Sequence, residues 1–168
     1  MSRRPEHTLN ELEIVQNPAL GAFALWQFGL AHQEEAGLSS PLPLAFLVLP
    51  LLLHKPTLET ISSTRKASGL ALFAGKLADQ REDLFAVHER ALLLRSLTLQ
   101  SLGVGLTARL LKIDYASAGL RGYPLEPGSK SPTLPERLRP FTGAAEKLGY
   151  WFYKTGLSQV AAAMRVDF

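Results

Sequence analysis

The glycines in the second half of the chain come closest to a chemical signature. Gly103, Gly105 and Ala108 follow the spelling of the glycine fingerprint that binds dinucleotide cofactors. That fingerprint needs a strand before it and a helix after it, because the N-terminus of the helix receives the pyrophosphate. Here a long helical pattern precedes the glycines and a strand-like pattern follows them. The sequence therefore predicts a glycine turn that ends a helix, and no cofactor.

A second glycine-containing stretch matches a phosphate-binding P-loop only in part. Five residues separate Gly122 from Gly128, one more than the motif allows, and Ser129 stands between the second glycine and Lys130. Two prolines in the stretch remove backbone N–H groups that a phosphate cradle needs. No ATP site is predicted, so any ATPase must be a separate chain.

Metal-binding and catalytic side chains are scattered. The chain has no cysteine, and its four histidines follow no metal-ligand spacing: His7, His32, His54 and His88. The acidic pairs at 34–35 and 82–83 are adjacent, so on a helix their side chains point about 100° apart and do not converge. We expect no metal site, no catalytic residue and a protein that is not an enzyme. The alternative is a catalytic centre assembled from residues far apart in the sequence.

Length and composition indicate one folded domain over residues 1–168, with a flexible N-terminus at 1–12. The chain is 46% hydrophobic and 20% charged, and its net charge of +3 is spread along its length. The first 13 residues lack the apolar stretch of a secretory signal, and cysteine is absent, so we expect the cytoplasm. The apolar run at 42–53 is too short to cross a bilayer and contains two prolines, so no membrane partner is expected.

The elements that would carry any site are mostly helical. Asn17 followed by Pro18 predicts the start of a helix that runs to Ala36, and Pro43 predicts the start of another to residue 53. Shorter helices are expected from Pro56 and over residues 67–77. Apolar residues at three- and four-residue spacing predict one long helix over 82–102: Leu84, Val87, Ala91, Leu94 and Leu97.

The apolar period then changes to that of a strand. Residues 111–115 alternate apolar and charged side chains, and residues 120–123 are expected to return as a second strand, which makes a β-hairpin. Four prolines predict a surface loop at 123–135, and the C-terminal segment 140–168 is expected to hold helices at 140–155, capped by Thr142, and 158–164. The fold class is therefore mainly α with a small β-hairpin (α+β), in the order of a winged-helix-like domain.

Apolar side chains are unusually dense in three segments. Residues 19–31 and 42–53 are apolar around the whole helix, and four aromatics follow one another at 150–153. One small core can hardly cover all three, so exposed aromatics are expected to bind partners. The candidate partner-binding residues are Trp26, Tyr150, Trp151 and Phe152. The alternative is that the two helices are central and the aromatics pack over their ends.

Basic side chains near two predicted turns are candidates for contact with DNA phosphates. Arg65 and Lys66 lie at an expected helix start, while Arg109, Lys112 and Arg121 flank the expected hairpin. A solvent-facing role without DNA is the alternative reading of the same residues.

Several segments, in order along most of the chain, resemble one family. They are residues 13–20 (EIVQNPAL), 41–57 (from PLPL to LHKPT), 63–65 (STR) and 147–152 (KLGYWF). Together they resemble the middle component of bacterial three-component ABC-ATPase conflict systems, the group that includes the small third subunit of Lamassu-type anti-phage defence. The loop at 123–135 has no counterpart in this resemblance.

The resemblance implies a noncatalytic subunit that bridges an SMC-like ABC ATPase and an effector, often a nuclease, and helps to restrain the effector until foreign DNA is sensed. Duplex DNA would be a further partner, reached through the complex. The competing hypothesis from the helix-then-hairpin order is an independent winged-helix DNA-binding regulator.

Overall fold

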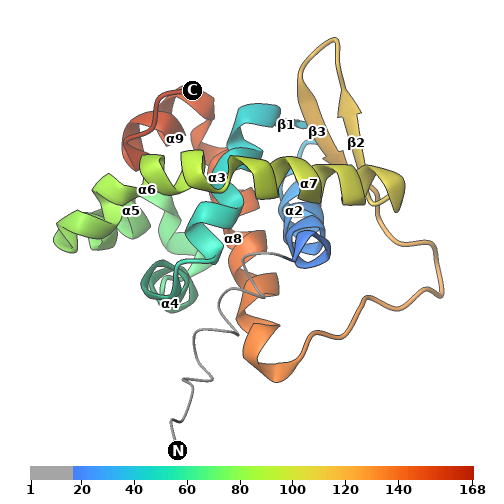
Figure 1. Ribbon diagram of the computed structural model, residues 1–168, viewed down its shortest axis with the longest axis horizontal. Coiled ribbons are helices and arrows are strands. Elements are labelled where there is room, and N and C mark those ends of the chain that lie inside the picture. Colours follow the sequence, from blue (N-terminus) through green and yellow to red (C-terminus); the bar gives the residue numbers. More distant parts are fainter. Residues whose placement is uncertain (1–16) are drawn as a thin grey trace, which may run out of the picture.

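The computed structural model describes residues 17–168, apart from the side chains of residues 81–83. The expected flexible N-terminus at 1–12, His7 and the first residues of the 13–20 motif lie outside this part, as do the side chains of the acidic pair 82–83. The described chain is mainly helical with one small antiparallel sheet, which confirms the expected fold class. Figure 1 shows the helices grouped around α2, with the hairpin projecting at one side.

Helix α2 (Pro18–Gln33) is the centre of the fold. The Asn17 side chain accepts hydrogen bonds from the N–H groups of Ala19 and Leu20, so the predicted cap is confirmed. Nearly every side chain of α2 is buried, because α8 (Arg139–Thr155) packs against one flank and α7 (Arg95–Thr107) against another. A helix that is apolar around its whole circumference must be surrounded, and here it is.

The second apolar segment forms α3 (Leu42–Leu52), which is followed by α4 (Lys55–Ser63) at a bend of 102°. Pro50 lies within the last turn of α3, as the sequence indicated. No single described helix is long and apolar enough to span a membrane. A short 3-10 turn, η1 (Lys66–Ser68), then leads into α5 (Gly69–Asp79).

The long helix expected over 82–102 is wrong in one respect, because the structure divides it. Helix α6 (Arg81–Leu93) ends at Leu94, where the backbone leaves helical geometry, and α7 begins at Arg95. Apolar spacing continues through the break, and so do hydrogen bonds of helical spacing, such as that from the Thr98 N–H to the Leu94 carbonyl oxygen, so periodicity alone does not reveal the break. The break lets α6 pack on α3 and α7 pack on α2.

The predicted glycine turn after residue 102 is also wrong. Helix α7 continues through Gly103 and Gly105 to Thr107. Gly105 is required by packing, because a Cβ there would overlap the side chain of Leu111 on the first strand of the hairpin. The turn out of the helix is made instead at Arg109, which adopts a left-handed conformation with φ of 59°.

The hairpin forms as predicted, with β2 (Leu111–Asp114) paired antiparallel to β3 (Gly119–Gly122). A third strand, β1 (Ser40–Pro41), was not predicted, because two residues carry no alternating pattern. It pairs with the other side of β3, so the sheet order is β1-β3-β2 and β2 is an outer strand. In the sequence, helices α3 to α7 all lie between β1 and β2, so the sheet is not formed by the hairpin alone. The winged-helix-like assignment therefore stays a prediction.

Residues 123–135 contain no helix or strand, as their prolines indicated, and Figure 1 shows them as a long connection. A 3-10 turn, η2 (Glu136–Leu138), then precedes α8. Thr142 does not cap this helix, which starts three residues earlier with Pro140 in its first turn and no side-chain cap. Gly156, with φ of 87°, ends α8 as expected, and α9 (Leu157–Met164) follows.

Candidate partner-binding surfaces

The predicted partner-binding aromatics lie mostly inside the molecule. Trp26 is 2% exposed, and Trp151 and Phe152 are fully buried. The Trp151 ring stacks on Phe73 at 5.4 Å, and its Nε1 donates a hydrogen bond to the carbonyl oxygen of Lys66 at 2.8 Å. The expectation that one core cannot cover the three apolar segments is therefore wrong, and these three side chains present no surface to a partner in this fold.

Tyr150 is the exception among the four, because it is partly exposed. The ammonium group of Lys66 lies 4.6 Å from the centre of its ring, in cation–π geometry. The other three aromatics are covered by the chain itself. A helix that is apolar on all sides can be either central in its own fold or covered by a partner, and its sequence pattern is the same in both cases.

The five residues predicted to contact DNA separate into two groups. Arg65 and Lys66 lie between α4 and α5, whereas Arg109, Lys112 and Arg121 lie around the hairpin, at the other side of the molecule in Figure 1. Arg121 is engaged internally, because its Nη1 donates to the carbonyl oxygen of Gly37. The structure thus does not bring the five together into one site.

Two lysines that the sequence did not single out join the first group. The Lys147 Nζ donates to the carbonyl oxygens of Ile61 and Ser62 at 3.2 and 3.1 Å, and the Lys76 Nζ donates to the Thr64 hydroxyl at 3.0 Å. Burial, with the charge of Lys76 nearby, lowers the pKa of Lys147. We call Arg65, Lys66, Lys76 and Lys147 the basic cluster. Among the described residues, no carboxylate lies within ion-pair distance of these four.

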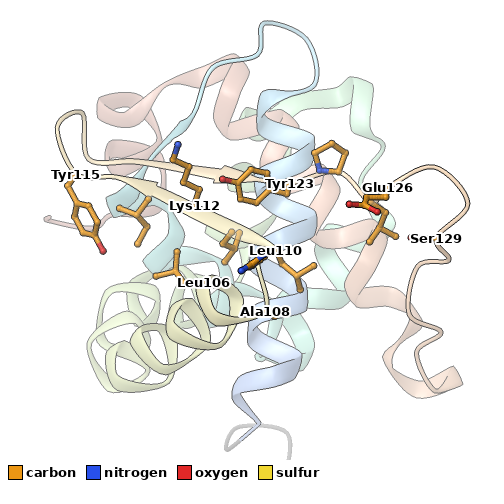
Figure 2. A pocket seen from close by; sticks show the side chains of 13 residues that line it. Leu106, Ala108, Leu110, Lys112, Tyr115, Tyr123, Glu126 and Ser129 are labelled. Atoms are coloured by element: carbon orange, nitrogen blue, oxygen red, sulfur yellow. The ribbon is translucent and has the colours of Figure 1, made fainter.

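A groove runs along the hairpin and is the first of the exposed surfaces. Its volume is about 720 Å³, and Figure 2 shows Tyr115 at one end, Tyr123 near the middle and Ser129 at the other end. Several of its apolar side chains face solvent, including Tyr115, which is 84% exposed. We call this surface the hairpin groove, and its lining residues are Leu106, 108–113, Tyr115, 123–126 and Ser129.

A second exposed apolar surface lies along α6. Phe85, Leu92 and Leu93 point into solvent there, and Leu93 is 80% exposed. Leu92 also borders a depression of about 460 Å³ between α3, α6 and the last residues of the chain, where Phe168 is exposed. We call the exposed side chains Phe85, Leu92, Leu93 and Phe168 the α6 face.

A third depression, of about 760 Å³, lies between α4 and the start of α8. Leu53 and Leu58 are partly buried and Phe141 is buried, and together they form much of its wall, so this depression is a further apolar surface beside the other two.

Some ionisable side chains in the described part of the chain make contacts that stabilise the fold. His32 is buried, its Nδ1 lies 3.3 Å from the carbonyl oxygen of Leu38, and burial lowers its pKa. The Lys154 ammonium pairs with the Glu35 carboxylate at 2.7 Å, which ties the end of α8 to the end of α2 and raises the pKa of Lys154. Among the side chains that the structure describes, which exclude those of residues 81–83, no group of three histidine, aspartate or glutamate residues could hold a metal ion.

A protein-family model described as ABC-three component (ABC-3C) system Middle Component 3 matches residues 6–168 of the chain. Among curated proteins and among solved structures, none matches it.

Proposed function

The chain belongs to the family of ABC-three component system Middle Component 3, and from this membership we propose that it is a noncatalytic subunit that bridges an SMC-like ABC ATPase and an effector nuclease. In this proposal the complex acts in the bacterial cytoplasm as a Lamassu-type anti-phage defence system. The subunit helps to hold the effector inactive until the complex senses foreign DNA.

The observation that carries the bridging role is the presence of two separate exposed apolar surfaces. The hairpin groove adjoins the C-terminal end of α7, and the leucines of the α6 face lie just before its N-terminal end. Helix α7 has 13 residues and is therefore about 20 Å long. A partner seated at one end would leave the other end accessible.

Burial of either surface in an interface would lower the free energy of the complex. Each large apolar side chain that moves from water into an interface contributes about 1.5–3 kcal/mol. Leu92 and Leu93 together thus offer on the order of 4 kcal/mol, and the exposed rings of Tyr115 and Tyr123 offer a similar amount. Helix α7 itself is fixed against α2, so it is suited to hold two partners at a constant separation.

Separate substitutions on the two surfaces test the proposal. The chain is co-expressed with the ATPase and effector of its system, and two variants are compared with wild type: Leu92→Glu with Leu93→Glu, and Tyr115→Glu with Leu125→Glu. All four side chains are exposed, so neither variant should disturb the core. Affinity purification on the chain is expected to recover one component with each variant, and a different one in the two cases.

Ser158→Glu with Gln159→Glu is the matched control, because both residues are exposed on α9, are polar in the wild type and belong to neither surface. This variant should recover both partners. Recovery of both partners by both surface variants, with folding intact, would remove these surfaces from the assembly and with them the structural support for a bridge.

A further inference from the structure

The two edges of the small sheet are treated differently. At the β1 edge, the Leu42 N–H donates to the Ala118 carbonyl at 2.8 Å. Beyond the end of β1, the Gln33 side chain makes the hydrogen bonds that a strand would make to Gly122. Its Nε2 donates to the Gly122 carbonyl at 2.7 Å, and its Oε1 accepts from the Gly122 N–H at 2.9 Å. The backbone groups of β3 that face this side are therefore satisfied within the chain.

The β2 edge is open. The Tyr123 N–H donates to the Leu110 carbonyl at 2.8 Å, which fixes the hydrogen-bonding phase of the hairpin. In this phase, Lys112 is hydrogen-bonded to Arg121 and Asp114 to Gly119. These are every second residue of β2. The N–H and C=O groups of Ile113 point the other way, and within the described residues they have no hydrogen-bond partner. Leu111 faces the same side but is only 2% exposed, so the accessible part of this edge is at Ile113.

The hairpin groove lies along this same edge. The side chains of Lys112 and Ile113 lie on opposite faces of β2, and both residues line the groove. The groove therefore lies beside the strand and not over one of its faces. The strand contains no proline and no bulge. It is short and carries one lysine, two features that limit uncontrolled pairing with other chains and still leave room for a strand of matching length.

We propose that the open edge of β2 is a docking site for an extended segment of a partner protein, which adds to the sheet as a fourth strand. This inference rests on the proposed function, in which one system component binds the hairpin groove. Two accessible backbone groups, the N–H and C=O of Ile113, would bond to the incoming strand. Its paired part would be about 13 Å long, the length of four extended residues.

The side chains around the edge define the chemistry of that segment. Ile113 and Tyr115 lie on one face of β2 and favour an apolar side chain on the same face of the added strand. Two cations line the groove, Arg109 and Lys112, against one carboxylate, Glu126. The segment is therefore expected to be extended, apolar at alternate positions and to carry an acidic side chain opposite the cations.

Ile113→Pro tests the backbone contact directly. Proline removes the Ile113 N–H, which faces the open edge, and leaves the bonds of Lys112 and Asp114 to β3 in place. Ile113→Thr is the matched control, because threonine is also β-branched and keeps the N–H. With the purified component that binds the hairpin groove as the probe, the proline variant should weaken the dissociation constant about tenfold or more and the threonine variant much less.

A second substitution distinguishes the loss of a hydrogen bond from misfolding of the proline variant. Replacing Ile113 by the corresponding α-hydroxy acid deletes the N–H and keeps the side chain, and it should weaken binding about as much as proline does. Hydrogen exchange resolved to single amides adds a direct readout. The amide of Ile113 should exchange rapidly in the free chain and become protected in the complex.

The outcomes separate strand addition from groove binding in general. If the proline and hydroxy-acid variants bind as wild type and the Ile113 amide of the wild type stays unprotected, strand addition is overturned. If Tyr115→Glu with Leu125→Glu still abolishes binding in that case, the groove remains a docking surface and the proposed function stands. A wild-type dimer that Ile113→Pro dissociates would assign the edge to a second copy of this chain and would also overturn the proposal.

Discussion

Helices α8 and α2 approach each other closely at Gly149, where α8 crosses α2. A Cβ at this position would overlap the Phe28 carbonyl oxygen and would lie 2.9 Å from the Ala31 Cβ and 3.0 Å from the His32 backbone nitrogen. Two of these atoms belong to the backbone of α2, so they cannot rotate away. Gly149→Ala would therefore force the two central helices apart.

Two opposing contributions set the size of the effect. Overpacking of a tight core contact costs about 1–3 kcal/mol, and the backbone partners here place Gly149 at the upper end. Alanine is better than glycine within a helix by about 1 kcal/mol, which offsets part of that cost. We expect Gly149→Ala to lower the free energy of unfolding by about 2 kcal/mol, which corresponds to a loss of about 4–8 °C in Tm.

Gly143→Ala, in the same helix, is the matched control because nothing lies within 4 Å of a Cβ placed there. It should raise stability by about 1 kcal/mol, so the two variants should differ by about 3 kcal/mol with opposite signs. Urea denaturation followed by circular dichroism measures both. If Gly149→Ala is as stable as Gly143→Ala, the α2–α8 crossing described here is incorrect.

Three further predictions follow from the buried and charged groups. Because burial lowers the pKa of His32 below 6.5, protons bind more readily to the unfolded chain, so stability is highest above that pH and falls as pH decreases toward the folded pKa. Urea titrations at several pH values should show this fall in wild type and its loss in His32→Gln. Trp151→Ala should lower stability by about 3–5 kcal/mol, yet the molecules that remain folded should bind partners as wild type does, as judged by affinity measured with the folded fraction held constant. The isolated chain should bind duplex DNA weakly, with a salt slope of magnitude no greater than about 4, because the basic cluster supplies four cations; a steeper slope would favour the rival DNA-binding regulator.

Local sequence signals predicted the elements that depend on local chemistry. Asn17 and Pro18 predicted where α2 begins, and the alternation at 111–115 predicted the hairpin. The prolines of 123–135 correctly indicated a segment without regular structure. In each case the decisive interaction joins residues that are close in the sequence, such as the cap bond from Ala19 to Asn17.

The surfaces could not be predicted in the same way, because they depend on which apolar faces meet. Trp151 is buried only because Phe73, far away in the sequence, stacks on it. Leu93 is 80% exposed although it lies within a run of three leucines, and the spacing of apolar residues does not reveal which of them the fold covers. The open edge of β2 depends on the pairing order of three strands, one of which is too short to leave a pattern.

The most direct test of the bridging role is a mass measurement on the assembled system. Complexes of the chain with its ATPase and effector are purified by size exclusion, and their composition is read by native mass spectrometry. Wild type should give a ternary complex, whereas Leu92→Glu with Leu93→Glu and Tyr115→Glu with Leu125→Glu should each give a binary complex that lacks a different partner. A ternary complex with both variants, or loss of the same partner from both, would contradict a bridge built on two surfaces.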